Sequence, residues 1–353
     1  MLKRTPLYHK HVELGAKMID FSGWEMPVQY ESILEEHITV RKSVGMFDIS
    51  HMGEIKIQGK GAKKTVLYLT PVHEQKLVPK RASYSFLLNE NGGVIDDLII
   101  YTFSEETFIL VVNAGNIEKD FNWIKENALS ETRVENISEN ISAISIQGPH
   151  STRISESLFS LELSNMKYYS FETNLEYRGS KILFLSRTGY TGELGFEIYT
   201  RPEDVENLWD ELLTLRVKPC GLGARDGLRL EAGMPLYGHE LNEDITPLEA
   251  NLRKFLDMER NFIGKKALIE RVVEKRLVGF KMIDKGVPRK EQKIIYQGQE
   301  VGYVTSGGYS PYLNEYIGMG YVKNNGIESE INIDMRGKEK RAVITALPFY
   351  RKG

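Results

Sequence analysis

The spacing of apolar residues predicts two different architectures along the chain. From about residue 46 to 127, alternating or continuous apolar runs and two stretches of helical spacing follow the order β-α-β-β-β-α. This order is compatible with a ferredoxin-like α+β unit of the split-βαβ type. From residue 276 onward, short apolar runs are separated by glycines, which is typical of a β-sandwich or β-barrel. The chain therefore combines an α+β part with an all-β part.

Turn and capping residues place the individual elements. Residues 1–31 have little periodicity and predict a loop-rich segment laid over another domain. Ser32 is a suitable N-cap with Glu35 at the capping-box position, and Gly45 ends the predicted helix. The elements expected next are a strand over 46–57, a helix over 61–69, strands over 81–88, 94–101 and 108–112, a helix over 117–127, strands over 141–149, 181–186 and 194–199, and helices over 202–213 and 224–231.

Two adjacent carboxylates interrupt the most apolar of these strands. Asn89-Glu90-Asn91-Gly92-Gly93 has hairpin-turn chemistry, and the strand that follows contains Asp96 and Asp97. Because side chains alternate along a strand, the two carboxylates point to opposite faces and cannot form an acid–base dyad. A lone buried ionisable group costs roughly 2–7 kcal/mol unless it is partnered. We therefore expect at least one of them to line a site; the alternative, stronger for Asp96 than for Asp97, is a hydrogen bond to backbone amides.

Other polar residues stand at positions where a ligand could meet them. Glu197 is an acid inside an apolar strand, and Asn113 ends a strand before a helix, where it either caps that helix or bonds a ligand. Arg225 lies near a helix N-terminus, which disfavours a cation, so its partner is Glu197, Asp226 or an anionic ligand. The glycines of residues 221–227 do not have the spacing of a dinucleotide-binding loop and do not follow a strand.

Composition limits the class of protein. The 353 residues suggest two or three domains, and the net charge of 46 − 49 = −3 gives no basic field for nucleic acid. No apolar run approaches the ~18–20 residues of a membrane span, and no signal peptide is recognised. The single Cys220 excludes an internal disulfide, is expected to be a small buried hydrophobe, and predicts a cytoplasmic protein. His9 and His11 could be a metal pair, but no ligand set completes it, so no metal is expected.

Several short stretches, in the same order over essentially the whole chain, resemble the aminomethyltransferase (T-protein) family of the glycine cleavage system. Each stretch alone is a weak signal, and their number in register carries the resemblance. They are Arg4-Thr5-Pro6-Leu7, Phe21-Ser22-Gly23-Trp24, Gly45-Met46-Phe47-Asp48-Ile49-Ser50-His51-Met52, Asn91-Gly92-Gly93-Val94-Ile95-Asp96-Asp97-Leu98, Arg187-Thr188-Gly189-Tyr190-Thr191-Gly192-Glu193, Gly221-Leu222-Gly223-Ala224-Arg225-Asp226, Leu228-Arg229-Leu230-Glu231-Ala232-Gly233, Leu236-Tyr237-Gly238-His239-Glu240, Phe262-Ile263-Gly264 and Pro348-Phe349-Tyr350.

The resemblance implies an α+β fold of three domains arranged as a cloverleaf around a folate site. Residues 1–45 and 139–255 would form the folate-binding α+β domain, and 46–138 an inserted ferredoxin-like domain. Residues 256–353 would form a β-barrel or jelly-roll-like domain, with a helical connector over 256–275. The implied reaction takes the aminomethyl group from the lipoyl arm of a partner, the H-protein. Tetrahydrofolate would receive the carbon as 5,10-methylenetetrahydrofolate, with release of ammonia and the dihydrolipoyl arm, and without a metal.

The resemblance also assigns roles to single residues. Asp97 matches the catalytic aspartate, whose carboxylate can hold a proton and stabilise the iminium cation formed as ammonia leaves. Glu197 matches a clamp for the pterin edge, whose two adjacent N–H groups suit one carboxylate. The further positions implied to line or border the pocket are Asn113, Tyr84, Tyr168, Tyr190, Arg225, Tyr237 and Arg351.

One departure and two rival functions accompany the resemblance. Arg253 and Lys254 stand in a segment where relatives have an aromatic residue near the folate, and these cations could favour polyglutamate tails or the acidic H-protein. The rivals are another tetrahydrofolate-dependent one-carbon transferase, such as a demethylase, and a non-catalytic folate-binding protein. The second of these carries a cysteine motif, and the corresponding residues 234–240 contain no cysteine.

Overall fold

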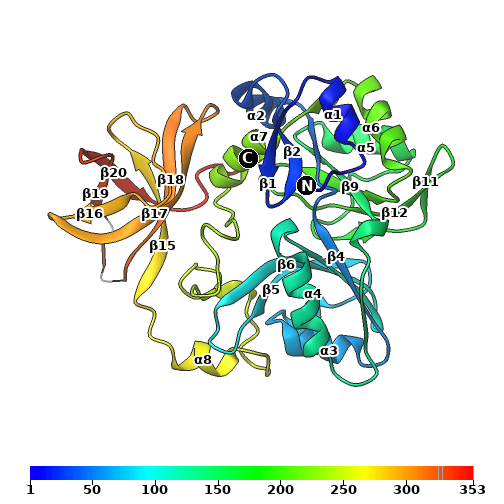
Figure 1. Cartoon of the computed structure of the whole chain (residues 1–353), viewed down its shortest axis with the longest axis horizontal. Helices are drawn as coiled ribbons and strands as arrows, with labels where there is room; N and C mark the ends of the chain where they lie inside the picture. Colours follow the sequence, from blue (N-terminus) through cyan, green and yellow to red (C-terminus); the bar gives the residue numbers. More distant parts are fainter. Residues whose placement is uncertain (325, 328, 353) are drawn as a thin grey trace.

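A computed structural model describes residues 1–324, 326–327 and 329–352. Its described strands form a two-stranded hairpin, a seven-stranded sheet, a five-stranded sheet and a closed barrel. Figure 1 shows three lobes: the barrel at the left, the first α+β domain at the upper right and the second below it. The α+β fold with a C-terminal barrel is thus as the sequence predicts.

The seven-stranded sheet is the core of the first domain. Its order is β10-β12-β13-β9-β3-β14, with β11 paired to β12. Every residue of β13 is buried, so its acid, Glu197, lies inside the domain. The strands are β3 (Gly45–Asp48), β9 (Ser142–Gln147), β10 (Phe171–Glu172), β11 (Leu175–Tyr177), β12 (Ser180–Ser186), β13 (Gly195–Thr200) and β14 (Lys218–Pro219), and the helices around them are α2 (Ile33–Lys42), α5 (Ser151–Phe159), α6 (Val205–Thr214) and α7 (Leu222–Glu231).

The second domain is an antiparallel sheet covered by two helices. The strand order is β5-β6-β7-β4-β8, and every neighbouring pair is antiparallel. It therefore has one strand more than a β-α-β-β-α-β unit. The elements are β4 (Gly53–Gln58), α3 (Ala62–Leu69), the 3-10 turn η1 (Glu74–Lys76), β5 (Arg81–Leu88), β6 (Val94–Ser104), β7 (Thr107–Val112), the 3-10 turn η2 (Ala114–Asn116), α4 (Ile117–Glu126), β8 (Arg133–Asn136) and the 3-10 turn η3 (Ser138–Asn140).

The C-terminal barrel closes in the order β15-β18-β17-β16-β19-β20. Its wall consists of β15 (Lys275–Met282), β16 (Lys293–Tyr296), β17 (Gln299–Ser310), β18 (Glu315–Lys323), β19 (Glu330–Asp334) and β20 (Glu339–Thr345). A long connection crosses from α7 past the second domain before it enters β15 (Figure 1). It contains the 3-10 turn η4 (Arg253–Phe255) and one short helix, α8 (Lys265–Glu270), so the helical connector expected over 256–275 is mostly irregular.

The single strand expected over 46–57 is wrong. The chain forms β3 in the seven-stranded sheet and β4 in the five-stranded sheet, with a turn between them. At this turn Asp48 Oδ1 accepts the Ser50 N–H at 2.9 Å, and the Met52 N–H bonds the Ile49 carbonyl. An Asp side chain that bonds the backbone two residues on competes with strand continuation. The chain therefore leaves the seven-stranded sheet after β3 and enters the five-stranded sheet at β4.

The loop-rich segment expected over 1–31 is also wrong. It forms α1 (Tyr8–Glu13) and a hairpin of β1 (Lys17–Phe21) and β2 (Trp24–Gln29). Ser22 and Gly23, the two turn residues, have φ of 52° and 84°, and the Asp20 carboxylate accepts the Gly23 N–H. Two positive φ values in a two-residue loop suit the right-handed twist of the strands.

The capping box expected at Ser32 and Glu35 does not form. Ser32 makes no side-chain cap hydrogen bond. Instead, buried Glu36 accepts the backbone N–H groups of Tyr30, Glu31 and Gly221. One carboxylate thereby joins the start of α2 to the start of α7, the helix that carries Arg225.

Candidate functional site

The two acids of β6 do point to opposite faces. Leu98 and Ile100, which share a face with Asp96, pack in the core beneath α3 and α4. Tyr101, on the face of Asp97, packs against the first domain. Asp97 is therefore directed toward the domain junction and Asp96 toward the helices.

Asp97 is half-buried and held by two polar side chains. The Tyr84 hydroxyl, on neighbouring β5, donates to Asp97 Oδ2 at 2.8 Å. The Asn113 amide, which follows β7, donates to Oδ1 at 3.0 Å. Burial and then the charge of Asp96 raise the pKa of Asp97 from 3.8 to about 7. Three residues expected to share a site, Asp97, Tyr84 and Asn113, are thus in direct contact.

Asn113 links the two acids rather than capping the next helix. Its side-chain Nδ2 also donates to Asp96 Oδ1 at 2.8 Å, and its backbone N–H donates to Oδ2 at 2.9 Å. No side-chain cap hydrogen bond is made to η2. Asp96 further accepts the Asn116 amide at 2.7 Å. The backbone-amide alternative for Asp96 is therefore partly correct, and the capping alternative for Asn113 is wrong.

Glu197 belongs to a second part of the candidate site, apart from the group around Asp97. Its Oε2 accepts the Thr188 hydroxyl at 2.6 Å, and Thr188 lies 3.3 Å from the Tyr101 hydroxyl. Burial raises the pKa of Glu197, while the Thr188 bond and the charge of Arg225 oppose the rise. Thr188 was not expected from the sequence as a site residue, although the Gly-punctuated stretch that contains it was singled out.

Arg225 lies near Glu197 without a direct ion pair to it. In the part of the chain that the structure describes, its buried Nη1 has no hydrogen-bond partner. The guanidinium stands 5.0 Å from the centre of the Tyr190 ring, and Asp226 pairs with Arg229 instead. A buried N–H group without an acceptor costs about 1–3 kcal/mol. The orphaned donor therefore fits a polar ligand placed between Arg225 and Glu197.

Tyr190 lies between Asp97 and the pair of Glu197 and Arg225. Its pKa is raised mainly by burial, and the charges of both Asp97 and Arg225 act on it. Its hydroxyl donates to the carbonyl of Pro235. Tyr168 is 43% exposed and lies at the rim, where burial of its hydroxyl and the charge of Glu197 raise its pKa to about 12.

In the described part of the chain, Tyr237 and Arg351 make no hydrogen bond to the other expected site residues. The Tyr237 hydroxyl accepts a hydrogen bond from Lys119 at 2.8 Å, on the helix side of β6. Arg351 is exposed, and no ion pair joins it to another described residue. The preceding Tyr350 docks instead, with its ring 3.9 Å from the Arg41 guanidinium.

An aromatic side chain does reach the site from the segment that contains Arg253 and Lys254. The Phe255 ring packs edge-on against Tyr84 with the ring centres 4.9 Å apart. Two cations lie over Phe255, with Lys254 Nζ at 5.0 Å and Lys76 Nζ at 5.9 Å from its centre. The departure seen in the sequence therefore adds cations beside an aromatic residue rather than removing it.

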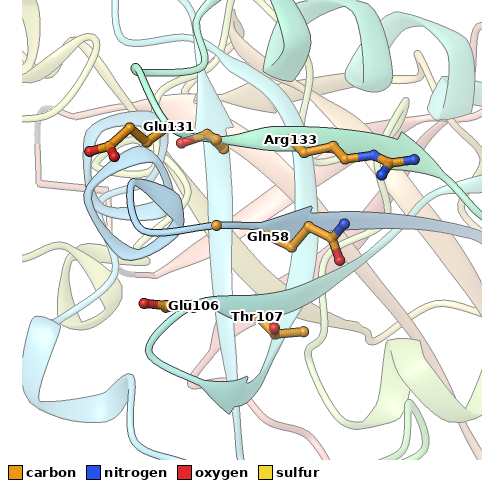
Figure 2. A pocket seen from close by; sticks show the side chains of 7 residues that line it. Gln58, Glu106, Thr107, Glu131 and Arg133 are labelled. Carbon is orange, nitrogen blue, oxygen red and sulfur yellow. The ribbon is translucent and has the colours of Figure 1, made fainter.

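A cavity of about 550 Å³ lies elsewhere, at the far end of the second domain. Figure 2 shows it between the ends of β4, β7 and β8, with Gln58, Thr107 and Arg133 around it. Gln58 pairs with Thr107 at one end of β4, whereas Gly53 pairs with Val112, next to Asn113, at the other. Because a strand rises ~3.3 Å per residue, this cavity is roughly 17 Å from the acids of β6.

Other predicted features of the chain are simple to place. Cys220 is free and buried, as expected. His11 is buried between Asp48 and Tyr30, at 2.9 Å from each, and no group of three or more potential metal ligands gathers within the described ranges. Of the helices that the structure describes, none is long and apolar enough to cross a membrane.

Family comparisons cover nearly the whole chain. Residues 7–260 match the model of the GCVT N-terminal domain. Residues 275–351 match that of the glycine cleavage T-protein C-terminal barrel domain. The junction between the two matches lies in the connection that carries α8.

Individual relatives agree with these matches. The aminomethyltransferase of Thermosipho melanesiensis is 47% identical over 356 residues, covering 99% of this chain and 98% of the relative. That of Geobacillus sp. is 44% identical, covering 100% of both chains. Among solved structures, the glycine cleavage system aminomethyltransferase T of Bartonella henselae is 34% identical. It superimposes with a TM-score of 0.93 over 99% of this chain and 98% of its own.

Proposed function

The chain belongs to the glycine cleavage T-protein family, and from this premise we propose how its residues perform aminomethyl transfer. It is an aminomethyltransferase of glycine cleavage, a tetrahydrofolate-dependent transferase of one-carbon units. The observation that supports the proposal best is the Asp97 carboxyl, which is held by Tyr84 and Asn113 and has a pKa of about 7. Such a group changes its proton occupancy near neutral pH, as a catalytic acid or base must.

Asp97 would stabilise the positive charge that develops on the one-carbon unit as ammonia leaves. A carboxylate fixed by two hydrogen bonds at the site of developing charge needs little reorganisation during the reaction. Tyr84 and Asn113 keep it in place, and the Phe255 ring packs beside Tyr84. Asp97 is therefore proposed as the catalytic residue of this chain.

Glu197 and Arg225 would hold tetrahydrofolate by its pterin ring. Glu197 can accept the two adjacent N–H donors of the pterin edge, and the unpartnered Nη1 of Arg225 can donate to a ring acceptor. Tyr190, which is half-buried at the junction, and Tyr168, which is exposed at the rim, would border the ring. The lipoyl arm would be supplied by the H-protein. The cytoplasmic location expected from the single cysteine stays a prediction.

One direct assay tests the whole proposal. Purified protein is mixed with tetrahydrofolate and aminomethyl-lipoyl H-protein, and ammonia and methylenetetrahydrofolate are followed together. Equal release of both products is the expected result. Folate binding without ammonia release would point to a different one-carbon donor and would overturn the proposed role of the H-protein.

The rate should depend on pH through Asp97. Since its pKa is raised to about 7, the carboxylate is the main form only above that pH and is lost below it. We expect kcat/KM to fall about tenfold per pH unit well below pH 7. Steady-state rates measured between about pH 5 and 9 check this. A kcat/KM that stays constant down to about pH 5, as an Asp with the ordinary pKa of 3.8 would give, would contradict the proposed environment of Asp97.

Replacing the clamp carboxylate should weaken folate binding more than it slows turnover. Hydrogen bonds to a charged group contribute about 1.5–3 kcal/mol, so Glu197→Ala should raise the tetrahydrofolate Kd by roughly 10- to 100-fold. Glu176→Ala, an exposed acid on the nearby strand β11, is the matched control. Calorimetric titration of both variants measures the effect, and an unchanged Kd for Glu197→Ala would remove the clamp assignment.

A further inference from the structure

Glu197 lies in a row of short hydroxyl side chains that crosses three strands of the seven-stranded sheet. In the strand register, Glu197 on β13 pairs with Ser186 on β12 and with Ser145 on β9. Directly opposite residues of antiparallel strands point to the same face, so the two buried serines flank the acid. The donor that reaches the acid itself comes from the loop after β12: the Thr188 hydroxyl donates to Glu197 Oε2 at 2.6 Å.

The Thr188 hydroxyl is fixed by its own neighbours. A hydroxyl has one proton and two acceptor sites. Because the Glu197 carboxylate can only accept, it takes the Thr188 proton, and the two acceptor sites remain for other donors. Two hydroxyls lie within reach of these sites, that of Ser186 at 2.9 Å and that of Tyr101 at 3.3 Å. Since Thr188 is buried, protein groups rather than solvent direct its hydroxyl at Glu197.

A buried glutamine fixes the glycine-punctuated loop that carries Thr188. The Gln147 amide donates to the Thr188 carbonyl at 3.1 Å and accepts the Thr191 hydroxyl at 2.8 Å, so it holds both sides of the turn. Two glycines pack against the same amide: a Cβ on Gly189 would come within 2.1 Å of it, and one on Gly195 within 2.2 Å. The backbone of the loop is therefore seated directly on Gln147, which holds Thr188 in place beside β13.

We propose that Thr188 is a positioning residue for the pterin clamp: its hydroxyl sets the rotation of the Glu197 carboxylate so that both oxygens face the two N–H donors of the pterin edge. The terminal torsion of a Glu side chain is broad, so a carboxylate without a partner would sample many rotations. Threonine suits this task because its β-branched side chain is stiff. A carboxylate oxygen has two acceptor sites, so Oε2 can bind Thr188 and a ligand N–H together. The inference rests on the proposed role of Glu197 in folate binding.

The hydroxyl network around Thr188 also reaches the second domain. Tyr101, on β6, brings its hydroxyl to Thr188, and its ring packs against Phe171 and Phe184 of the first domain with ring centres 5.4 and 4.8 Å apart. Tyr101→Phe keeps this packing and removes only the hydroxyl. We expect it to raise the tetrahydrofolate Kd by about threefold, because Thr188 then loses one of its donors.

Two substitutions of Thr188 separate the effect of the hydroxyl from that of side-chain size. Thr188→Val keeps the shape and removes the hydroxyl, so the tetrahydrofolate Kd should rise about tenfold, as for the loss of one hydrogen bond to a charged group. Thr188→Ser keeps the hydroxyl and should stay within about threefold of wild type. Thr200→Val is the matched control: it makes the same change on β13, at a buried threonine that bonds the Lys181 carbonyl.

Calorimetric titration measures each Kd, and steady-state rates at saturating folate measure kcat. The kcat of Thr188→Val should stay within about threefold of wild type, since a lost binding contact changes affinity rather than turnover. A Kd for Thr188→Ser as high as that for Thr188→Val would overturn the role of the hydroxyl. Circular dichroism shows whether the variants are folded. If Thr188→Val does not fold, Tyr101→Phe makes the same test from the second domain, and an unchanged Kd there would overturn the inference.

A double-mutant cycle separates positioning from a merely structural role. In protein that carries Glu197→Ala, Thr188→Val should change the Kd by less than about twofold, because the carboxylate that Thr188 positions is gone. Equal losses with and without Glu197 would show that Thr188 acts on the fold and would overturn the inference. If Glu197→Ala itself leaves the Kd unchanged, the proposed clamp is wrong and the inference with it. If Glu197→Ala weakens binding and Thr188→Val does not, the inference alone is wrong.

Discussion

Asp97→Asn is expected to lower kcat by about 10²–10⁴, the usual contribution of a positioned acid–base group. The tetrahydrofolate Kd should stay within about threefold, because the proposed pterin contacts belong to Glu197 and Arg225 rather than to Asp97. The amide keeps the size of the side chain. Its oxygen can still accept the Asn113 amide, and the Tyr84 hydroxyl can rotate to accept its NH₂ group. What is lost is the charge.

The measurement combines single-turnover kinetics with equilibrium folate binding. Single turnover isolates the chemical step from product release. Asp210→Asn, on the exposed face of α6, is the matched control, since it makes the same change far from the junction. Turnover of Asp97→Asn close to that of the control would exclude Asp97 from the mechanism. A large rise in the folate Kd would instead make it a binding residue.

Sequence alone could predict Asp97, Tyr84 and Asn113 as one group because local rules constrain each of them. Alternation along β6 fixes the face of Asp97, and the resemblance to a family indicates which positions meet. Thr188 and Asn116 are not predicted from the sequence, because each acts through contacts that neither periodicity nor spacing encodes.

The wrong predictions about the fold have physical causes of the same kind. Residues 46–57 alternate almost continuously, but alternation does not tell which sheet a strand joins, and the turn at Asp48 depends on one side chain. Residues 1–31 contain short elements whose periodicity covers too few residues to be recognised. The barrel was predicted well because its glycine-separated runs are frequent and regular.

The second large effect concerns Arg41, which joins elements of the first domain to the end of the chain. Its guanidinium donates to Glu231 at 2.7 Å, to Glu193 at 3.1 Å and to the Thr191 carbonyl at 2.8 Å. The ring of Tyr350 lies against it at 3.9 Å, and the Tyr350 backbone N–H bonds the Glu231 carbonyl. One buried cation thus joins α2, α7, the glycine-punctuated loop and the end of the chain.

Arg41→Met should therefore be strongly destabilising. It leaves buried Glu193 without its cation and buried Glu231 with only His37, at 2.8 Å, and breaking one partner of a buried pair costs about 3–5 kcal/mol. Arg341→Met, which breaks an exposed pair with Asp284, is the matched control and should cost about 0–1 kcal/mol.

Urea unfolding followed by both circular dichroism and fluorescence measures the free energy of unfolding of each variant, and coincidence of the probes tests whether a single transition describes the unfolding. Equal losses in the two variants would mean that the buried network contributes no more than a surface pair. A selective loss for Arg41→Met would show that this buried cation, which bonds Thr191 and Glu193 directly, stabilises the fold.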